Sequence, residues 1–367
     1  MKVGILTSSR ADFGIYQPLI RELKKNSIFK IEVIVFGAHL SQYHGNSFQE
    51  IIDFGAPVIH RITTNLASDD ENSISTTYGL TVIKFAEFWK NNSYDYVFCL
   101  GDRYEMNASV QSGIPFRIKF AHLYGGEVTL GAIDNIYRNQ ISAASTLHFT
   151  SNEDYRKNVI RIIGSKENVY AVGSLSLDEN IDELILSEGE FREKFSIPKG
   201  DFILATFHPE TMMPQKNQFY KEEMSKALIL ILGKTNLVIT LPNADTCGNL
   251  FRDQLISIGE KYPPKVKIIN NFGRTGYFSA LKYCSIVLGN SSSGIVEAAS
   301  FDKYVVNVGD RQKGRATSNN IVNCRFISYE ILQAVNETLK LDKFNGRNIY
   351  YKKNTAKKIV EVLIKTK

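Results

Sequence analysis

Short runs of apolar residues alternate with stretches of helical periodicity along the first half of the chain. Residues 3–7 form the first run, and a polar turn leads from it to apolar residues spaced as on one face of a helix. Further apolar runs follow at 31–36, 94–100, 118–123, 146–150 and 169–172. Short, nearly continuous apolar strands that alternate with helices are typical of a parallel sheet covered on both faces.

The same alternation restarts after a charged stretch. Residues 174–200 contain no strand-like run and are interpreted as a linker helix. Beyond them the pattern predicts helices that alternate with strands, and an amphipathic helix at 356–364. These strands are expected at 202–207, 237–241, 266–269, 286–288 and 304–308. The sequence therefore predicts an α/β protein with two similar domains, 1–173 and 174–349.

Composition limits the class of protein. The chain has 367 residues, of which 43% are hydrophobic and 22% charged, as in a globular protein with room for about two domains. Its net charge of +6 comes from scattered Lys and Arg, so no nucleic-acid partner is expected. The longest apolar run, 227–232, is far shorter than the roughly 18 residues of a membrane span, and no secretory leader is recognised. We therefore expect no membrane partner and a cytoplasmic location.

Three carboxylates follow predicted strands or open predicted helices of the first half: Asp102, Glu127 and Asp134. Ligands of open α/β sheets bind beyond the carboxyl ends of the strands, so these groups can serve one site. No metal site is expected, because neither a His spacing nor the four cysteines (positions 99, 247, 284 and 324) supply a ligand set. We interpret the acids as proton-transfer groups, with helix caps as the alternative.

Arginines accompany these acids. Arg10 and Asp12 lie in the first polar turn, Arg103 lies in a later one, and Arg138 stands one helical turn after Asp134. A guanidinium can bind phosphate through two hydrogen bonds, so these residues are candidates for substrate binding. Local ion pairs, Arg10 with Asp12 and Arg138 with Asp134, are the competing interpretation.

A run of small residues, Asn290-Ser291-Ser292-Ser293-Gly294, separates a predicted strand from a predicted helix in the second half. Small residues let the backbone approach a ligand, and a helix start carries partial positive charge, so Ser292, Ser293 and Gly294 are candidates for phosphate binding. Glu297 could accept hydrogen bonds from ribose hydroxyls. An ordinary serine N-cap is the alternative. The sequence contains neither the GxGxxG motif of dinucleotide-binding folds nor a P-loop lysine motif.

Four more polar residues occupy predicted strand ends: His39, His208, Asn243 and Arg311. His208 is the main candidate among them, because imidazole changes charge near neutral pH. A lone histidine is more often structural, and the position alone leaves that alternative open.

Several motifs occur in a fixed order over most of the chain: SSRADFG, GAHL, GDRYE, HLYGGE, DNIYRNQIS, the loop at His208, NSSSGIVEA and GDRQKGR. Together they resemble the hydrolysing UDP-N-acetylglucosamine 2-epimerases, which feed sialic and related nonulosonic acid synthesis. The non-hydrolysing relatives open with a GTRPE-like turn in place of SSRADFG. They also tend to carry basic residues after the histidine, where this chain has Pro209-Glu210-Thr211.

The resemblance implies a GT-B-like fold of two Rossmann-like domains whose parallel sheets face each other across a cleft, with 350–367 completing the first domain. It implies no metal or redox cofactor, and a homodimer or homotetramer. It also assigns contacts to residues already singled out: Ser292, Ser293 and Glu297 to diphosphate and ribose, Arg10 and Arg311 to phosphate charge, and Asp102, Glu127, Asp134 and His208 to the sugar.

The expected reaction converts UDP-N-acetylglucosamine, or a UDP-2,4-diacetamido-6-deoxy sugar, and water to UDP and the free 2-epimer, of the N-acetylmannosamine type. Anti elimination gives a 2-acetamidoglucal, and hydration returns the C2 proton from the other face. We predict that Asp102 and Asp134 divide the proton transfers and that Glu127 orients or shares one. A permutation of these roles and GDP in place of UDP stay open. The alternatives are a GT-B glycosyltransferase, a non-hydrolysing epimerase and a silent sugar-nucleotide sensor.

Overall fold

The chain forms two compact units. The computed structural model describes residues 1–41, 47–56, 58–64, 66, 70–178, 181–242 and 248–366. Unit 1 comprises Met1–Glu127, Ile133–Glu179 and Tyr350–Lys367, and unit 2 comprises Val128–Ala132 and Asn180–Ile349. The five residues 128–132, for which the sequence indicated no separate role, thus group with the second unit.

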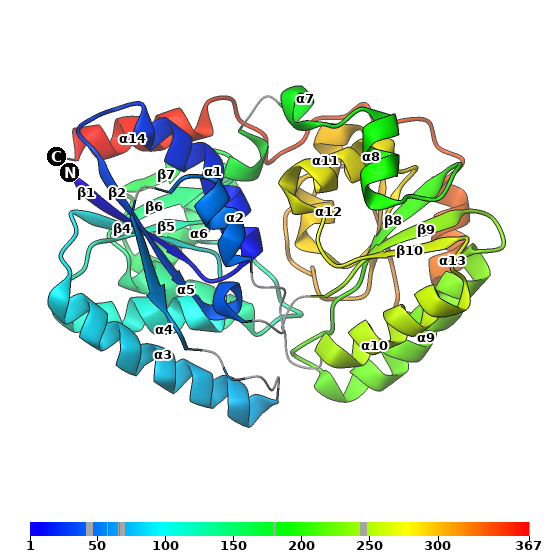
Figure 1. Ribbon diagram of the computed structural model, residues 1–367, viewed down its shortest axis with the longest axis horizontal. Coiled ribbons are helices and arrows are strands. Elements are labelled where there is room, and N and C mark those ends of the chain that lie inside the picture. Colours follow the sequence, from blue (N-terminus) through cyan, green and yellow to red (C-terminus); the bar gives the residue numbers. More distant parts are fainter. Residues whose placement is uncertain are drawn as a thin grey trace. The chain divides into compact units, whose positions relative to one another are not determined.

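Within the described residues, unit 1 is built on a seven-stranded parallel sheet in the order β3-β2-β1-β4-β5-β6-β7 (Figure 1). The strands are β1 (Lys2–Thr7), β2 (Lys30–Phe36), β3 (Ile59–Ile62), β4 (Tyr96–Leu100), β5 (Phe120–Leu123), β6 (Leu147–Thr150) and β7 (Val169–Ala171). The helices are α1 (Arg10–Lys24), α2 (Phe48–Asp53), α3 (Glu71–Asn91), α4 (Tyr104–Gly113), α5 (Asp134–Ala144), α6 (Glu153–Ile163) and α14 (Thr355–Lys365).

Helices cover both faces of this sheet. Consecutive strand residues point to opposite sides, and both sides are apolar, so each face packs against helices. Ile5 packs with Leu19 of α1 and Leu363 of α14, whereas Leu6 packs with Phe85 of α3 and Met106 of α4. Figure 1 shows α1 and α14 on one side of the sheet and α3 and α4 on the other. The C-terminal helix therefore contributes to the core of the unit that contains the N-terminus.

Unit 2 repeats the architecture with six strands among the described residues, in the order β10-β9-β8-β11-β12-β13. The strands are β8 (Phe202–Thr206), β9 (Asn236–Thr240), β10 (Val266–Ile269), β11 (Val287–Gly289), β12 (Val305–Val308) and β13 (Ile321–Cys324). The helices are α7 (Ile181–Leu184), α8 (Glu188–Phe195), α9 (Asn217–Ile231), α10 (Gly248–Lys261), α11 (Gly273–Tyr283), α12 (Ser292–Val296) and α13 (Ser328–Thr338). Ile203 packs with α9 and α10, and its neighbour Leu204 packs with α8 and α11.

Both sheets reverse their strand order at one place, between β1 and β4 in unit 1 and between β8 and β11 in unit 2. This is the Rossmann-type order, and ligands of such sheets bind beyond the strand ends at the reversal. The predicted α/β class with two Rossmann-like units is thus confirmed. The edge strands β3 and β13 were not predicted. In place of one linker helix, the described residues of 174–200 form a 3-10 turn (Leu175–Leu177) and the two short helices α7 and α8.

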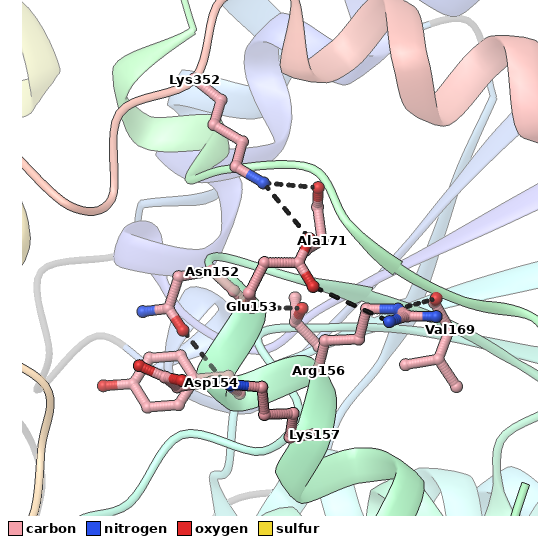
Figure 2. A network of polar contacts seen from close by, with 10 residues as sticks. Asn152, Glu153, Asp154, Arg156, Lys157, Val169, Ala171 and Lys352 are labelled. Carbon is pink, nitrogen blue, oxygen red and sulfur yellow. Dashed lines mark hydrogen bonds and ion pairs between the residues drawn. The ribbon is translucent and has the colours of Figure 1, made fainter. Parts of the chain in front are cut away.

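Side-chain cations cover the outer edge of β7, the last strand of the unit 1 sheet (Figure 2). Arg156 Nε donates to the carbonyl of Val169 at 2.8 Å, and Lys352 Nζ donates to the carbonyl of Ala171 at 2.9 Å. The Glu153 carboxylate forms ion pairs with both cations, Oε2 with Arg156 Nη1 at 3.7 Å and Oε1 with Lys352 Nζ at 3.9 Å. An edge strand presents unpaired backbone groups to other chains, and charged side chains on the edge oppose such pairing.

The C-terminal segment is held in unit 1 by polar contacts to its neighbours. Asp178 Oδ2 accepts from the backbone N–H of Ala356 at 2.8 Å, in the first turn of α14. The hydroxyls of Tyr155 and Tyr350 bond at 2.8 Å. Among the described residues, no helix combines the length and apolarity that crossing a membrane requires.

Candidate active site

Arg138 joins two of the predicted carboxylate positions in unit 1. It is fully buried on α5, and its Nη2 forms an ion pair with Asp102 Oδ2 while its Nη1 donates to the Glu127 carbonyl at 2.7 Å. The N-cap of α4 is Arg103, so the helix-cap alternative for Asp102 does not apply. Arg138 thereby fixes the Asp102 carboxylate beside the backbone that carries Glu127.

The turn after β5 places Glu127 beside β6. Gly126 has a φ of +77°, and a Cβ there would lie 2.2 Å from the carbonyl oxygen of Tyr155, so glycine is required. Glu127 is 5% exposed, and its Oε1 accepts from the Ser151 hydroxyl at 3.0 Å. The glycine at position 126 therefore makes the sharp turn that brings Glu127 to Ser151.

Two residues that the sequence analysis did not single out support this part of the site. His122 Nε2 lies 2.9 Å from the carbonyl oxygen of Gly101, just before Asp102, and its Nδ1 lies 3.0 Å from Ser142 Oγ. Buried Glu105 accepts from Arg103 Nε at 2.9 Å, and burial raises the pKa of this carboxyl. In the sequence, the only indication of a role for these two residues is that Glu105 follows strand β4 and that His122 lies in strand β5.

Asp134 opens α5 and is half-buried. Burial raises the pKa of the Tyr137 phenol, and the nearby charges of Asp134 and Glu105 raise it further. Asp134 and Arg138 thus share α5, but the bonds of Arg138 described above connect it to Asp102 and Glu127.

Asp12 and His39 are buried among protein groups at the ends of β1 and β2. Asp12 Oδ2 accepts from the backbone N–H groups of Ser8 and Ser9 at 3.0 and 3.1 Å, which completes the capping box of α1. His39 contacts Thr7 Oγ1 and Ser47 Oγ, both at 2.8 Å, and burial lowers the pKa of its imidazole. Arg10 is half-buried, and burial lowers the pKa of its guanidinium.

In unit 2, Asn290 connects the loops that follow β8, β11 and β12. Its side chain donates to the His208 carbonyl at 2.8 Å and accepts from the His208 N–H at 2.7 Å. Its own carbonyl accepts from Arg311 Nη1 at 3.1 Å and from Gln312 Nε2 at 2.9 Å. The predicted residues His208 and Arg311 therefore lie around one shared asparagine.

Glu210 and Gly131 shape the loop that carries Arg311. Glu210 Oε1 accepts from the Asp310 N–H at 2.8 Å, and burial raises the pKa of the Glu210 carboxyl. A Cβ on Gly131 would lie 2.3 Å from the Asp310 carbonyl oxygen and 2.7 Å from Arg311 Cα, so a side chain cannot fit there. The acidic residue two places after His208 thus serves the backbone of the neighbouring loop.

The serine run after β11 contains both a helix cap and a side-chain network. Ser291 is the N-cap of α12 and accepts from the Ser293 N–H at 3.4 Å. Ser292 is exposed and Gly294 is buried. Ser293 Oγ donates to Glu297 Oε2 at 2.9 Å. The cap interpretation thus applies to Ser291, the residue just before the three candidates.

Asn243 lies outside the described residues. Cys99 and Cys284 are buried, and burial raises the pKa of each thiol to about 12, which does not suit a nucleophile. Across the described part of the chain, no group of three or more His, Cys, Asp or Glu residues is arranged to hold a metal ion.

Comparison with known proteins identifies the family. The model of the UDP-N-acetylglucosamine 2-epimerase family matches residues 21–364. The chain belongs to this family. It is 33% identical to the GDP/UDP-N,N'-diacetylbacillosamine 2-epimerase (hydrolyzing) of Campylobacter jejuni, over 88% of this chain and 84% of the relative. It is 30% identical to the UDP-N,N'-diacetylbacillosamine 2-epimerase (hydrolyzing) of Legionella pneumophila, over 99% and 95%.

A solved structure of the same family has the same fold. The crystal structure of the Neisseria meningitidis UDP-GlcNAc 2-epimerase bound to UDP-GlcNAc matches the whole of both chains with a TM-score of 0.80 at 18% identity. Together with the two relatives, this confirms the GT-B-like fold class and the resemblance to hydrolysing 2-epimerases. The chain is a sugar-nucleotide 2-epimerase.

Proposed function

We propose that this epimerase converts a UDP-linked 2-acetamido sugar and water to UDP and the free 2-epimer. The sugar is N-acetylglucosamine or its 2,4-diacetamido-6-deoxy counterpart. The names of the Campylobacter and Legionella relatives support the 2,4-diacetamido-6-deoxy sugar. The ligand of the Neisseria structure supports N-acetylglucosamine.

The observation that carries the proposal is the contact of Arg138 with both Asp102 and the Glu127 backbone. Removing the weakly acidic proton at C2 and returning one from the other face requires two differently placed acid/base groups. Asp102 and Asp134 perform these transfers, and Glu127, held by Ser151, orients or shares one. Arg138, Asp12 and His39 assist by holding the strand-end loops in place.

Unit 2 supplies the groups that bind the anion. UDP departs from C1 as the C2 proton leaves, so negative charge develops on its diphosphate oxygens. His208 and Arg311, both held by Asn290, stabilise that charge. Arg10 and Arg103 are the candidates of unit 1 for substrate binding. Ser292 and Gly294 are small, so the backbone of this turn can approach the phosphates and bind them. Glu297 accepts hydrogen bonds from the ribose hydroxyls.

Product analysis tests the reaction. Incubating the enzyme with UDP-N-acetylglucosamine, UDP-2,4-diacetamido-6-deoxyglucose or a GDP analogue in deuterated water should release one free 2-epimer with a single deuterium at C2. Release of a UDP-linked epimer would indicate the non-hydrolysing reaction. Recovery of all three substrates unchanged would contradict the proposed reaction.

Substitution of Asp102 tests the assignment of the acids. Asp102→Asn should lower turnover by roughly 10² to 10⁴ if the carboxylate transfers a proton. Asp154→Asn is the matched control, because Asp154 is exposed on α6 and pairs with Lys157 at 3.1 Å. Equal turnover of the two variants would remove Asp102 from the mechanism.

A cytoplasmic location and a homodimer or homotetramer complete the proposal. Cell fractionation and light scattering of the purified enzyme test these two points.

A further inference from the structure

Three side chains of unit 2 form a hydrogen-bonded chain behind the serine run. Tyr277 on α11 bonds through its hydroxyl to Ser293 Oγ, and Ser293 Oγ bonds to Glu297 Oε2 at 2.9 Å. Tyr277 was not indicated by the sequence motifs and lies 16 residues before Ser293.

Counting protons fixes the direction of both bonds. An ionised carboxylate can only accept, so Ser293 donates its single hydroxyl proton to Glu297. The Ser293 oxygen is then the acceptor of its other bond, and Tyr277 must be the donor. Burial, with a contribution from the charge of Glu297, raises the pKa of the Tyr277 phenol, which keeps this donor protonated.

This direction has a consequence for the serine run. The hydroxyl proton of Ser293 is committed to Glu297, so this side chain does not donate to a ligand phosphate while the chain is intact. Ser292, which is exposed, keeps its hydroxyl for that purpose. The two neighbouring serines thus differ in role although the sequence presents them as equivalent.

We infer that Tyr277 is a positioning residue that acts through Ser293 to orient the Glu297 carboxylate toward the ribose hydroxyls of the bound nucleotide. The inference rests on the proposed function, which assigns ribose binding to Glu297. It adds that selection of a ribonucleotide over a 2′-deoxyribonucleotide depends on a phenol that does not touch the ligand.

Tyr277→Phe tests this by removing the donor and keeping the ring. The variant loses a hydrogen bond between two neutral hydroxyls, so UDP should bind to it roughly threefold to tenfold more weakly by calorimetry. The preference for UDP over 2′-deoxy-UDP should fall by a similar factor, KM should change more than kcat, and competition by inorganic pyrophosphate, which lacks ribose, should stay the same. Ser293→Ala should reproduce these shifts, and combining both substitutions should add little.

Tyr283→Phe is the matched control. Tyr283 lies on the same helix, but its hydroxyl donates to the Leu186 carbonyl at 2.8 Å. If Tyr277→Phe and Ser293→Ala discriminate the two nucleotides as well as Tyr283→Phe does, the inference is wrong and the proposed function stands. If the unsubstituted enzyme binds no UDP, both are overturned.

Discussion

Asn290 binds His208 through both of its backbone polar groups, although 82 residues separate the two. The same asparagine accepts from Arg311 and Gln312 through its own carbonyl. The side-chain amide of Asn290 thereby ties the loop after β8 to the loop after β11, because an amide both donates and accepts. The backbone carbonyl of the same residue holds the loop after β12.

Replacing Asn290 by Ala should lower turnover at least tenfold and reduce the free energy of unfolding by about 1–3 kcal/mol, since buried backbone groups of His208 lose their partners. Steady-state kinetics and urea unfolding measure the two effects. The control is Asn236→Ala, whose side chain also bonds to backbone carbonyls (Lys199 and Asp201) but is only half-buried, at the start of β9. Similar losses in both variants would contradict a specific role.

Glu210 should be replaceable by glutamine but not by alanine. Gln keeps an oxygen that can accept from the Asp310 N–H, whereas Ala leaves that donor unsatisfied. We expect turnover within about threefold of the parent for Glu210→Gln and a loss of about tenfold or more for Glu210→Ala. Kinetic assays at one saturating substrate concentration suffice, and an equal loss in both variants would point to a need for the negative charge instead.

Stability should fall as the pH drops below about 6.5, because neutral histidines are buried in unit 1. His122 and His148 are paired neighbours on β5 and β6, and burial lowers their pKa values to about 3 and about 4. Above the unfolded-state pKa of about 6.5, both states are neutral at these sites. Between about pH 6.5 and 4 the unfolded chain binds protons that the folded chain does not, which costs about 1.4 kcal/mol per pH unit for each imidazole.

Urea unfolding at pH 7.5, 6 and 5 measures this slope. His148→Phe removes one titrating ring and should reduce the slope by the contribution of one proton. An unchanged slope in the variant would show that His148 does not cause the acid sensitivity.

The edge of β7 should become prone to association when its cations are removed. In the double variant Arg156→Ala, Lys352→Ala, the carbonyls of Val169 and Ala171 lose their partners. We expect earlier aggregation on heating, measured by light scattering, with turnover unchanged. Lys157→Ala is the control, because Lys157 pairs with Asp154 on α6 (Figure 2). Equal aggregation of the double variant and the control would contradict a role for the edge cations.

The strands that the sequence did not predict share one physical property. β3 and β13 lie at sheet edges, and polar residues interrupt their short apolar stretches: His60 and Arg61 in β3, and Asn323 in β13. The other two edge strands, β7 and β10, were predicted. Partly solvated strands do not need a continuous apolar run, so their sequences resemble loops. The inner strands are buried on both faces and therefore consist of nearly continuous apolar runs, from which they were predicted.

The amino-acid sequence by itself determined the α/β class, the doubled organisation and the strand ends at which Asp102, Glu127, His208 and Ser292 stand. These follow from short-range periodicity and from the rule that ligands bind at strand ends. Only the tertiary structure decided which polar residues pair over longer separations: Arg138 pairs with Asp102 across 36 residues, and Tyr277 bonds to Ser293 across 16. Such hydrogen bonds form between groups that the fold brings close together, and the spacing of distant residues along the chain does not predict which groups these are.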